Sequence, residues 1–113
     1  MKNILTIAGY DPTSGAGITR DADTFFSFGF HAISVPAGTV VQGPKGVMDV
    51  FPTPQDQFSL MLGMINDDLQ VDGVKIGVVC DRWYVDEISR FLRKKKGIPV
   101  VVDPVFASKN KKE

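Results

Sequence analysis

Residue types that suit ligand binding follow the ends of several apolar segments of this chain. Gly9 and Asp11 come after the first segment, Gln42 follows the second, Val78 lies at the end of the third, and Asp103 follows the fourth. If these segments are parallel strands, their carboxyl ends meet at one edge of a sheet, where open α/β sheets bind ligands. The sequence therefore predicts a small-molecule site at that edge.

The glycine-rich loop after the first segment excludes the two common phosphate-binding motifs. Gly9 and Gly15 are too far apart for the dinucleotide fingerprint, and no Gly-Lys-Ser/Thr sequence follows as in a P-loop. Asp11 would also repel a pyrophosphate placed at the start of the following helix. A neutral ligand held by backbone amides fits this loop better. The alternative is a plain strand-to-helix turn, in which glycine adopts left-handed dihedral angles and Asp11 or Ser14 caps the helix.

Three polar side chains near this edge each allow a functional and a structural interpretation. Asp21 either faces back toward the loop or is a solvated helix carboxylate. Gln42 carries an amide that can pair with the edge of a heterocycle, or it is an exposed side chain. Asp103 is either a carboxylate of a Mg²⁺ or phosphate region or part of a turn that caps a helix. Cys80 and His31 are interpreted as structural residues.

The segments that must position these residues are apolar and rich in valine and isoleucine. They do not alternate with polar residues, which is typical of parallel strands covered on both faces. Stretches with helical spacing of apolar residues separate them, so the pattern predicts an α/β protein with a mainly parallel sheet. The predicted strands are Ile4–Ala8, Ala32–Ala37, Val74–Val79 and Ile98–Val102.

Local signals mark the starts of two helices and a hairpin. Thr53 is predicted as the N-cap of the second helix, with Pro54 at its first helical position, and Asp81 as the N-cap of the third. The sequence Gly43–Gly46 suits a β-turn between two apolar segments. We therefore expect residues 38–52 to form a small β-hairpin that acts as a flap over the site.

Length and charge limit the remaining possibilities. A chain of 113 residues forms one domain at most, and its 13 basic and 13 acidic side chains cancel. Nucleic-acid and membrane-surface partners would require a basic excess, so neither is expected. The sequence shows no signal peptide and no apolar stretch of membrane-spanning length, and it has a single cysteine. These features predict a protein of the reducing cytoplasm.

Several short motifs extend over nearly the whole chain. They are Leu5-Thr6-Ile7-Ala8-Gly9, Asp11-Pro12, Gly15-Ala16-Gly17-Ile18, Asp21, Thr24-Phe25, Gln42, Gly46-Val47, Lys75-Ile76-Gly77 and Val101-Val102-Asp103-Pro104-Val105. In their order and spacing they resemble the hydroxymethylpyrimidine/phosphomethylpyrimidine kinases of thiamine biosynthesis, within the ribokinase-like superfamily.

This resemblance implies a three-layer α/β/α ribokinase-like fold and phosphorylation of a pyrimidine by ATP with Mg²⁺. It implies that Asp21 and Gln42 hold the aminopyrimidine, and that Asp103 lies near the Mg²⁺ and phosphate groups. The hairpin at residues 38–52 matches the lid that covers the substrate in the family. The substrate-binding residues that the resemblance implies are Gly9, Ala16, Asp21, Gln42, Val78 and Val105.

The chain departs from the family at several positions around the predicted pocket. Tyr10, Asp23 and Val78 replace the family's usual residues, as do Gly43-Pro44 in the hairpin and residues 106–110 after the last strand. These differences bear on the shape of the pocket. They leave both a pyrimidine and a pyridoxal class of substrate open.

The second departure from the family is length, because the family's enzymes are longer. On the resemblance, residues 1–113 are the N-terminal, substrate-binding half of a truncated ribokinase-like domain. The catalytic residues and the ATP site are then expected in a missing C-terminal half, so the isolated chain is expected to be an inactive kinase. We expect it to form a homo-oligomer or to pair with that half. The alternative is a non-catalytic pyrimidine-binding or association module.

Overall fold

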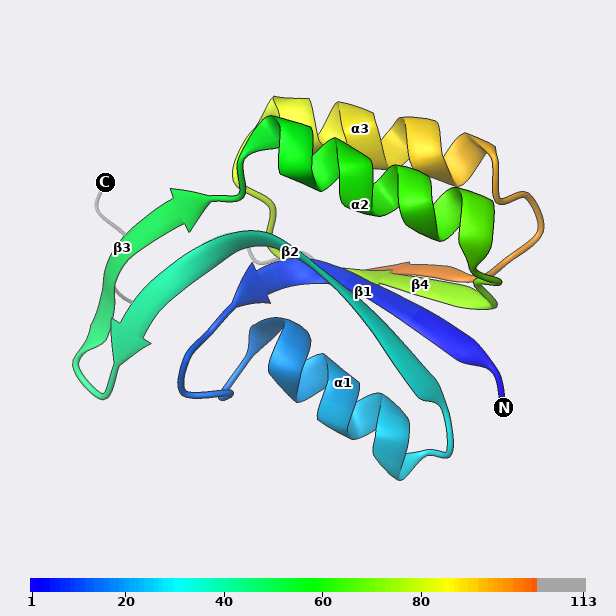
Figure 1. The fold of residues 1–113 in the computed structure, drawn as a ribbon. Helices are drawn as coiled ribbons and strands as arrows, with labels where there is room; N and C mark the ends of the chain where they lie inside the picture. Colours follow the sequence, from blue (N-terminus) through cyan, green and yellow to red (C-terminus); the bar gives the residue numbers. More distant parts are fainter. Residues whose placement is uncertain (104–113) are drawn as a thin grey trace.

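The elements of the structure follow the predicted alternation of strands and helices. The computed structural model describes residues 1–103, which contain five strands and three helices (Figure 1). These are β1 (Asn3–Tyr10), α1 (Gly17–Ser27), β2 (His31–Gly43), β3 (Gly46–Pro52), α2 (Gln55–Asp68), β4 (Gly73–Ile76), α3 (Arg82–Arg93) and β5 (Val100–Val102).

The strands form one sheet in the order β3-β2-β1-β4-β5. β1 pairs in parallel with β2 and β4, and β4 pairs in parallel with β5. β3 is antiparallel to β2, and their hairpin pairs residues 38–43 with residues 46–52. Because its second half belongs to this hairpin, β2 continues past the predicted end at Ala37. The helices α2 and α3 lie on one face of the sheet and α1 on the other (Figure 1), which confirms the predicted three-layer fold.

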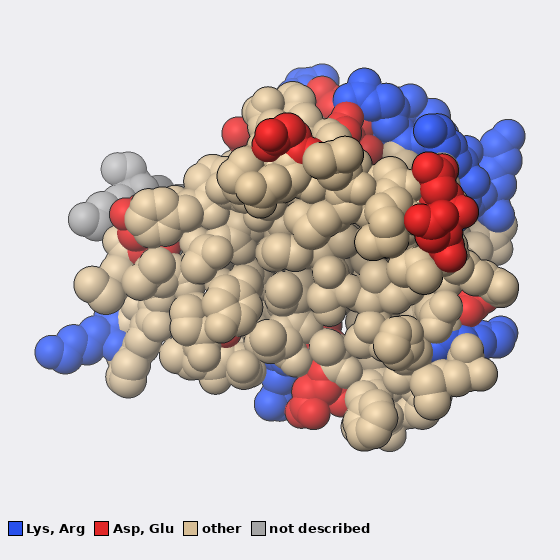
Figure 2. Space-filling model, in the orientation of Figure 1, with Lys and Arg blue, Asp and Glu red and all other residues tan. Residues whose placement is uncertain are grey.

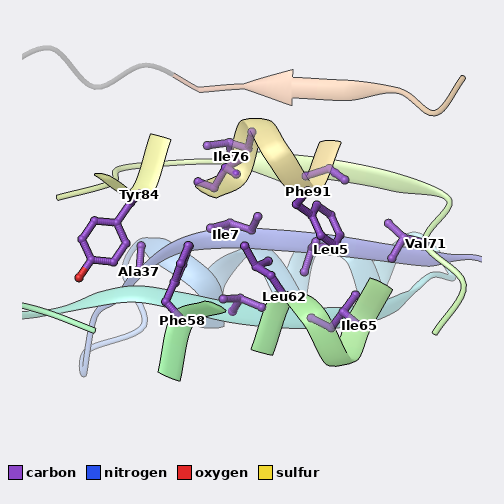
Figure 3. Close-up of a cluster of buried hydrophobic side chains, with 13 residues drawn as sticks. Leu5, Ile7, Ala37, Phe58, Leu62, Ile65, Val71, Ile76, Tyr84 and Phe91 are labelled. Carbon is purple, nitrogen blue, oxygen red and sulfur yellow. The ribbon is translucent and has the colours of Figure 1, made fainter. Parts of the chain in front are cut away.

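The main hydrophobic core lies between the sheet and the layer formed by α2 and α3 (Figure 3). Leu5 and Ile7 of β1 are fully buried in it, as is Phe58 of α2. The Phe58 ring packs edge-to-face against the Tyr84 ring of α3, with 5.0 Å between their centroids. Burying an apolar side chain of this size contributes roughly 1.5–3 kcal/mol. This core holds α2 and α3 against the sheet.

The face of the sheet toward α1 is more polar. Thr6 of β1 pairs in register with Lys75 of β4, so both side chains point to the same face. Because side chains alternate along a strand, Thr6 points away from the face that carries Leu5 and Ile7. Thr6 is fully buried and Lys75 partly buried. Because both are shielded from solvent, they require polar partners. Asp21 of α1 is the partner of both.

β4 is shorter than predicted, because it ends at Ile76 and not at Val79. The next N–H group, that of Gly77, still donates to a β1 carbonyl at 2.8 Å. The chain then reaches β2, where the Cys80 Sγ atom lies 3.5 Å from the Ala37 carbonyl oxygen. Since β1 lies between β4 and β2, this segment crosses the carboxyl end of β1 and does not extend β4.

One of the two predicted helix caps is wrong and the other is confirmed. Thr53 does not cap α2, because its hydroxyl donates to the Pro36 carbonyl of β2 at 2.7 Å. Pro54 takes the position before the helix with an extended ψ of 136°, and α2 begins one residue later. Asp81 does cap α3, since its side chain accepts a hydrogen bond of 2.9 Å from the Trp83 N–H.

Charge is spread unevenly over the surface. Figure 2 shows Lys and Arg side chains gathered over the end of α3, whose last turn carries Arg90 and Arg93. The helix dipole favours cations at this end. β3 exposes the apolar side chains of Met48 and Phe51 instead. Within residues 1–103, no helix has the length and apolar character needed to cross a membrane.

Candidate functional site

The loop between β1 and α1 folds back onto the end of β1. Gly17, the first residue of α1, has a φ of +74°, and a Cβ atom there would lie 2.1 Å from the Gly9 carbonyl oxygen. A backbone bridge also joins Tyr10 to Gly17. A side chain at position 17 would meet both an unfavourable dihedral angle and the backbone of β1. Glycine at this position therefore lets the loop close tightly over the edge of the sheet.

Asp11 organises this loop from within. Its side chain is only 3% exposed. Its Oδ1 atom accepts hydrogen bonds of 2.8 Å from both the N–H and the hydroxyl of Thr13. Burial alone would raise the pKa of Asp11, but hydrogen bonds from Thr13, the Gln42 side chain and the Ala16 backbone outweigh it and lower the pKa. Asp11 is therefore an ionised carboxylate that holds the loop.

The structure does not support helix capping by Asp11 or Ser14. The N-cap position of α1 is Ala16, and no side chain forms a cap hydrogen bond there. Asp11 is bound within its own loop, and Ser14 has a φ of +60° at the loop's turn. The first N–H groups of α1 are consequently not occupied by a capping side chain.

The hairpin of β2 and β3 brings Gln42 to the same loop. Gln42 is partly buried and lies opposite Val47 of β3. Its side chain contributes to the lowered pKa of Asp11. Two residues earlier in β2, the Val40 Cγ2 atom would lie 3.0 Å from a Cβ atom at Gly9. The hairpin and the glycine-rich loop are thus packed together, and the part that Gln42 plays in ligand binding stays a prediction.

Asp21 of α1 faces the sheet and not the solvent. Its Oδ2 atom accepts a hydrogen bond of 2.7 Å from the Thr6 hydroxyl and forms an ion pair of 2.8 Å with the Lys75 Nζ atom. The side chains of Asp21 and Lys75 are 15% and 21% exposed. Both bonds use Oδ2, so Oδ1 has no hydrogen bond within residues 1–103. This arrangement contradicts the interpretation of Asp21 as a solvated helix carboxylate.

The sequence interpretation missed Thr6 and Lys75 as partners of Asp21. Both lie inside strands whose apolar neighbours predict the strand but not a polar partner. A signal was present, because a lysine within an otherwise apolar buried strand requires a counterion. A close approach also marks the position: a Cβ atom at Gly77 would lie 3.3 Å from the Lys75 Nζ atom. Gly77 therefore leaves space beside the ammonium group.

The remaining predicted residues lie at the carboxyl ends of β4 and β5. Val78 follows β4 and is 46% exposed. Asp103 follows β5, its side chain is exposed, and its N–H donates to the Ile76 carbonyl at 2.8 Å. Val105 lies outside the described residues. Within residues 1–103, no hydrogen bond joins Asp103 to Asp21 or to Gln42.

The described residues offer one carboxylate, Asp103, at the predicted Mg²⁺ position. No group of three or more His, Cys, Asp or Glu side chains in residues 1–103 could hold a metal ion. Mg²⁺ in kinase sites is often bound by only one or two carboxylates together with substrate phosphates. A single carboxylate is thus compatible with such a shared site but does not form a metal centre by itself.

The assembled groups suit a small heterocycle. Within residues 1–103 the Asp21 Oδ1 atom accepts no hydrogen bond, and the Gln42 amide keeps a donor and its acceptor besides its hydrogen bond to Asp11. Gly9 is buried at the end of β1 and has no side chain. These groups come from α1, β2 and the end of β1. Groups of these kinds can recognise the edge of a ring by hydrogen bonds.

Comparison with known proteins gives consistent matches over nearly the whole chain. A family model described as phosphomethylpyrimidine kinase matches residues 11–113. A hydroxymethylpyrimidine/phosphomethylpyrimidine kinase of Aquifex aeolicus (strain VF5) is 38% identical over 109 residues, which are 96% of this chain. The match covers 43% of that relative. The chain therefore spans less than half the length of this curated relative.

Solved structures give the same result for the fold. A crystal structure of phosphomethylpyrimidine kinase from Clostridium difficile 630 superposes with a TM-score of 0.89 at 35% identity, covering 96% of this chain and 47% of that one. A pyridoxal kinase from Staphylococcus aureus in complex with AMP-PCP has a TM-score of 0.86 at 27% identity, covering 96% of this chain and 40% of that one. Both likenesses extend across the strands and helices described above.

Proposed function

The chain belongs to the phosphomethylpyrimidine kinase family, and we propose that it binds the aminopyrimidine substrate of such a kinase at the carboxyl edge of its sheet. The observation that carries this proposal is the Asp21 carboxylate, whose Oδ2 atom is held by the buried Thr6 hydroxyl and the partly buried Lys75 ammonium group, while its Oδ1 atom has no hydrogen bond within residues 1–103. Hydroxymethylpyrimidine has an exocyclic amino group and ring nitrogens that such a carboxylate and the Gln42 amide can pair with. We place this function in thiamine biosynthesis, as the family resemblance implies.

Each predicted site residue has a defined part in this proposal. Asp21 accepts a hydrogen bond from the amino group of the ring, and Gln42 pairs with a ring nitrogen. The backbone at Gly9 and Ala16 borders the ring. The apolar side chains of Val78 and Val105 contact its faces.

The hairpin of β2 and β3 acts in this proposal as a lid over the ring. Its contact with the glycine-rich loop, through Val40 and Gly9, supports this position. Covering the ring would exclude water, which strengthens hydrogen bonds to the ring and prevents transfer of phosphate to water. The Gln42 side chain would then close the site together with the lid.

We propose that the complete reaction is the ATP-dependent phosphorylation of the bound pyrimidine. The complex of the related pyridoxal kinase with AMP-PCP supports the use of ATP. Phosphoryl transfer depends on positioning and on stabilising the charge of the transferred group. Residues 1–103 contain no glycine-rich phosphate-binding motif, so we assign to them the binding and orientation of the pyrimidine. Asp103 is proposed to share a Mg²⁺ ion with the substrate phosphates.

Ligand-dependent melting of the 113-residue chain tests this proposal. Binding to the folded state raises the melting temperature, and we expect hydroxymethylpyrimidine in excess to do so by more than pyridoxal does. Gln42→Ala should weaken hydroxymethylpyrimidine binding about tenfold, the loss of roughly one good hydrogen bond. Gln57→Ala, an exposed glutamine on α2, is the matched control. A cooperative melt that neither compound shifts would contradict the proposed function.

A second function, association with another polypeptide, is supported by the β5 edge. All three residues of β5 are exposed, Val101 to 60%, and within residues 1–103 β5 pairs only with β4. An open, apolar strand edge favours pairing with a further strand. We propose that a second copy or the rest of a longer kinase covers it, in the reducing cytoplasm that the single cysteine suggests. Sedimentation as a monomer at all concentrations, with no partner added, would contradict association between copies.

A further inference from the structure

We infer that Lys75 determines whether this site prefers a neutral or a cationic ring. By pairing with Asp21, it makes the site select a neutral heterocycle over a cationic one. The inference rests on the proposed function, because it concerns the same site. Lys75 is a specificity-determining residue in this view, and it acts through Asp21 and not by contact with the ring.

The sheet register brings the three groups together. Thr6 and Lys75 are direct neighbours on adjacent strands and point to the same face. α1 packs on that face and places the Asp21 Oδ2 atom 2.7 Å from the Thr6 hydroxyl and 2.8 Å from the Lys75 Nζ atom. Two donors thus converge on one oxygen, and within residues 1–103 the other oxygen accepts no hydrogen bond, so we assign it to the ligand. The two strand residues therefore fix the orientation of the carboxylate.

The electrostatic consequence follows from the depth of this pair. A partly buried carboxylate without a partner attracts a cation strongly, because solvent screens it incompletely. With the Lys75 ammonium group 2.8 Å away, the ion pair has no net charge. The carboxylate then acts toward a ligand mainly as a hydrogen-bond acceptor. A neutral aminopyrimidine can use that acceptor. A ring with a fixed positive charge gains little from it and meets the nearby ammonium group.

Within residues 1–103, one other buried carboxylate, that of Asp11, lies near the carboxyl end of β1, and it does not explain a preference for neutral rings. Asp11 is held by Thr13 within its loop, and its pKa is lowered, so it stays ionised. Its charge would favour a cation. Because that charge is the same in the parent and in variants at position 75, it cancels when their affinities are compared.

The test compares two ligands that differ in charge. Titration calorimetry at one mildly alkaline pH measures the affinities of hydroxymethylpyrimidine and of its N-methylated pyrimidinium, whose charge is permanent. In Lys75→Met the ratio of cation affinity to neutral affinity should rise about tenfold over the parent, as expected for removing a cation near the ring. Steric effects of the methyl group cancel in this comparison. Lys75→Arg should keep the parent ratio, as should Lys94→Met, which removes an exposed lysine beside α3.

A double variant separates action through Asp21 from a direct effect. Asp21→Asn combined with Lys75→Met removes both charges, so its affinity ratio should return to that of the parent. Lys75→Gln serves as a second charge-removing variant if Lys75→Met melts too low, because its amide can still donate toward Asp21. A parent that binds neither ligand would overturn the proposed function and this assignment with it. A parent that binds, with the same ratio in Lys75→Met and Lys75→Gln, would overturn this assignment alone.

Discussion

The two faces of the central sheet come from the same strands but differ in chemistry. On the face toward α2 and α3, Leu5 joins a cluster of buried apolar side chains that includes Phe58. On the face toward α1, the next residue of β1 is Thr6, which binds Asp21, and Asp21 in turn binds Lys75. Side chains alternate along a strand, so one short strand serves both environments.

The two faces of the sheet contribute differently to stability and to specificity. Apolar burial is non-directional and stabilises in proportion to the area removed from water. A buried ion pair gains little net stability, because desolvation offsets the attraction between its charges, but it fixes geometry. We therefore expect substitutions on the face toward α2 and α3 to change the free energy of unfolding most. Substitutions on the face toward α1 should change ligand binding more than stability.

Phe58→Ala should have the largest effect on stability. It removes a fully buried ring between the sheet and α3, and we expect the free energy of unfolding to fall by about 3–5 kcal/mol. Leu60→Ala removes an exposed side chain of the same helix and should change it by less than about 0.5 kcal/mol. Urea unfolding measures both. Equal effects would mean that α2 does not pack against the sheet through the face that carries Phe58.

Gly17→Ala should come next, with a loss of about 2–4 kcal/mol, because the methyl group meets the Gly9 carbonyl and the φ is positive. Gly29→Ala isolates the dihedral contribution. Its φ is +87° with no atom near the added Cβ, so we expect a loss of about 1–2 kcal/mol. Only Gly17→Ala should also abolish the ligand-induced rise in melting temperature. A ligand shift that survives would place the site away from this loop.

Thr6→Val probes the polar face without changing side-chain shape much. It removes a donor to Asp21, and we expect a loss of about 1–3 kcal/mol in unfolding free energy together with weaker ligand binding. The control is Thr24→Val on α1, whose exposed hydroxyl binds its own helix backbone, and there we expect less than about 0.5 kcal/mol. Denaturant unfolding and calorimetry give the two quantities. Unchanged ligand affinity in Thr6→Val would argue against orientation of Asp21 from the sheet.

The smallest effect concerns the pH dependence of stability. Burial raises the pKa of Asp11, but its hydrogen bonds outweigh this and lower the pKa below that of the unfolded chain. The ionised group therefore stabilises the fold above the unfolded pKa, and this contribution is lost as the pH falls through the folded pKa. Below about pH 4, the parent should lose stability more steeply than Asp11→Asn. An exposed control, Asp68→Asn, should keep the parent slope.

Much of the fold was predictable because its signals are local. The apolar strands, the helical spacing between them, the turn at Gly43–Gly46 and the Asp81 cap depend on residues a few positions apart. These signals were enough for the order of elements and for a mainly parallel sheet. The failed cap at Thr53 shows their limit, since a distant carbonyl, that of Pro36, competed for the same hydroxyl.

The sequence also predicts a place for the site, because the carboxyl ends of parallel strands meet at one edge. It predicts Gly9, Asp11, Asp21 and Gln42 near that edge, and only the packing of the loop that holds Asp11 against Gln42 is seen in the structure. The structure packs the loop against the hairpin and leaves the binding roles of these residues as predictions. Family membership came from motifs that the sequence carries in order, and the family match covers residues 11–113.

Only the tertiary structure decided which side chains act together. Asp21 meets Thr6 across 15 residues of sequence and Lys75 across 54. Those encounters depend on the register between β1 and β4 and on the packing of α1, which no local pattern specifies. The sequence thus determined the elements and the edge where they end. The register of the sheet and the packing of α1 decided that Thr6 and Lys75 are the partners of Asp21.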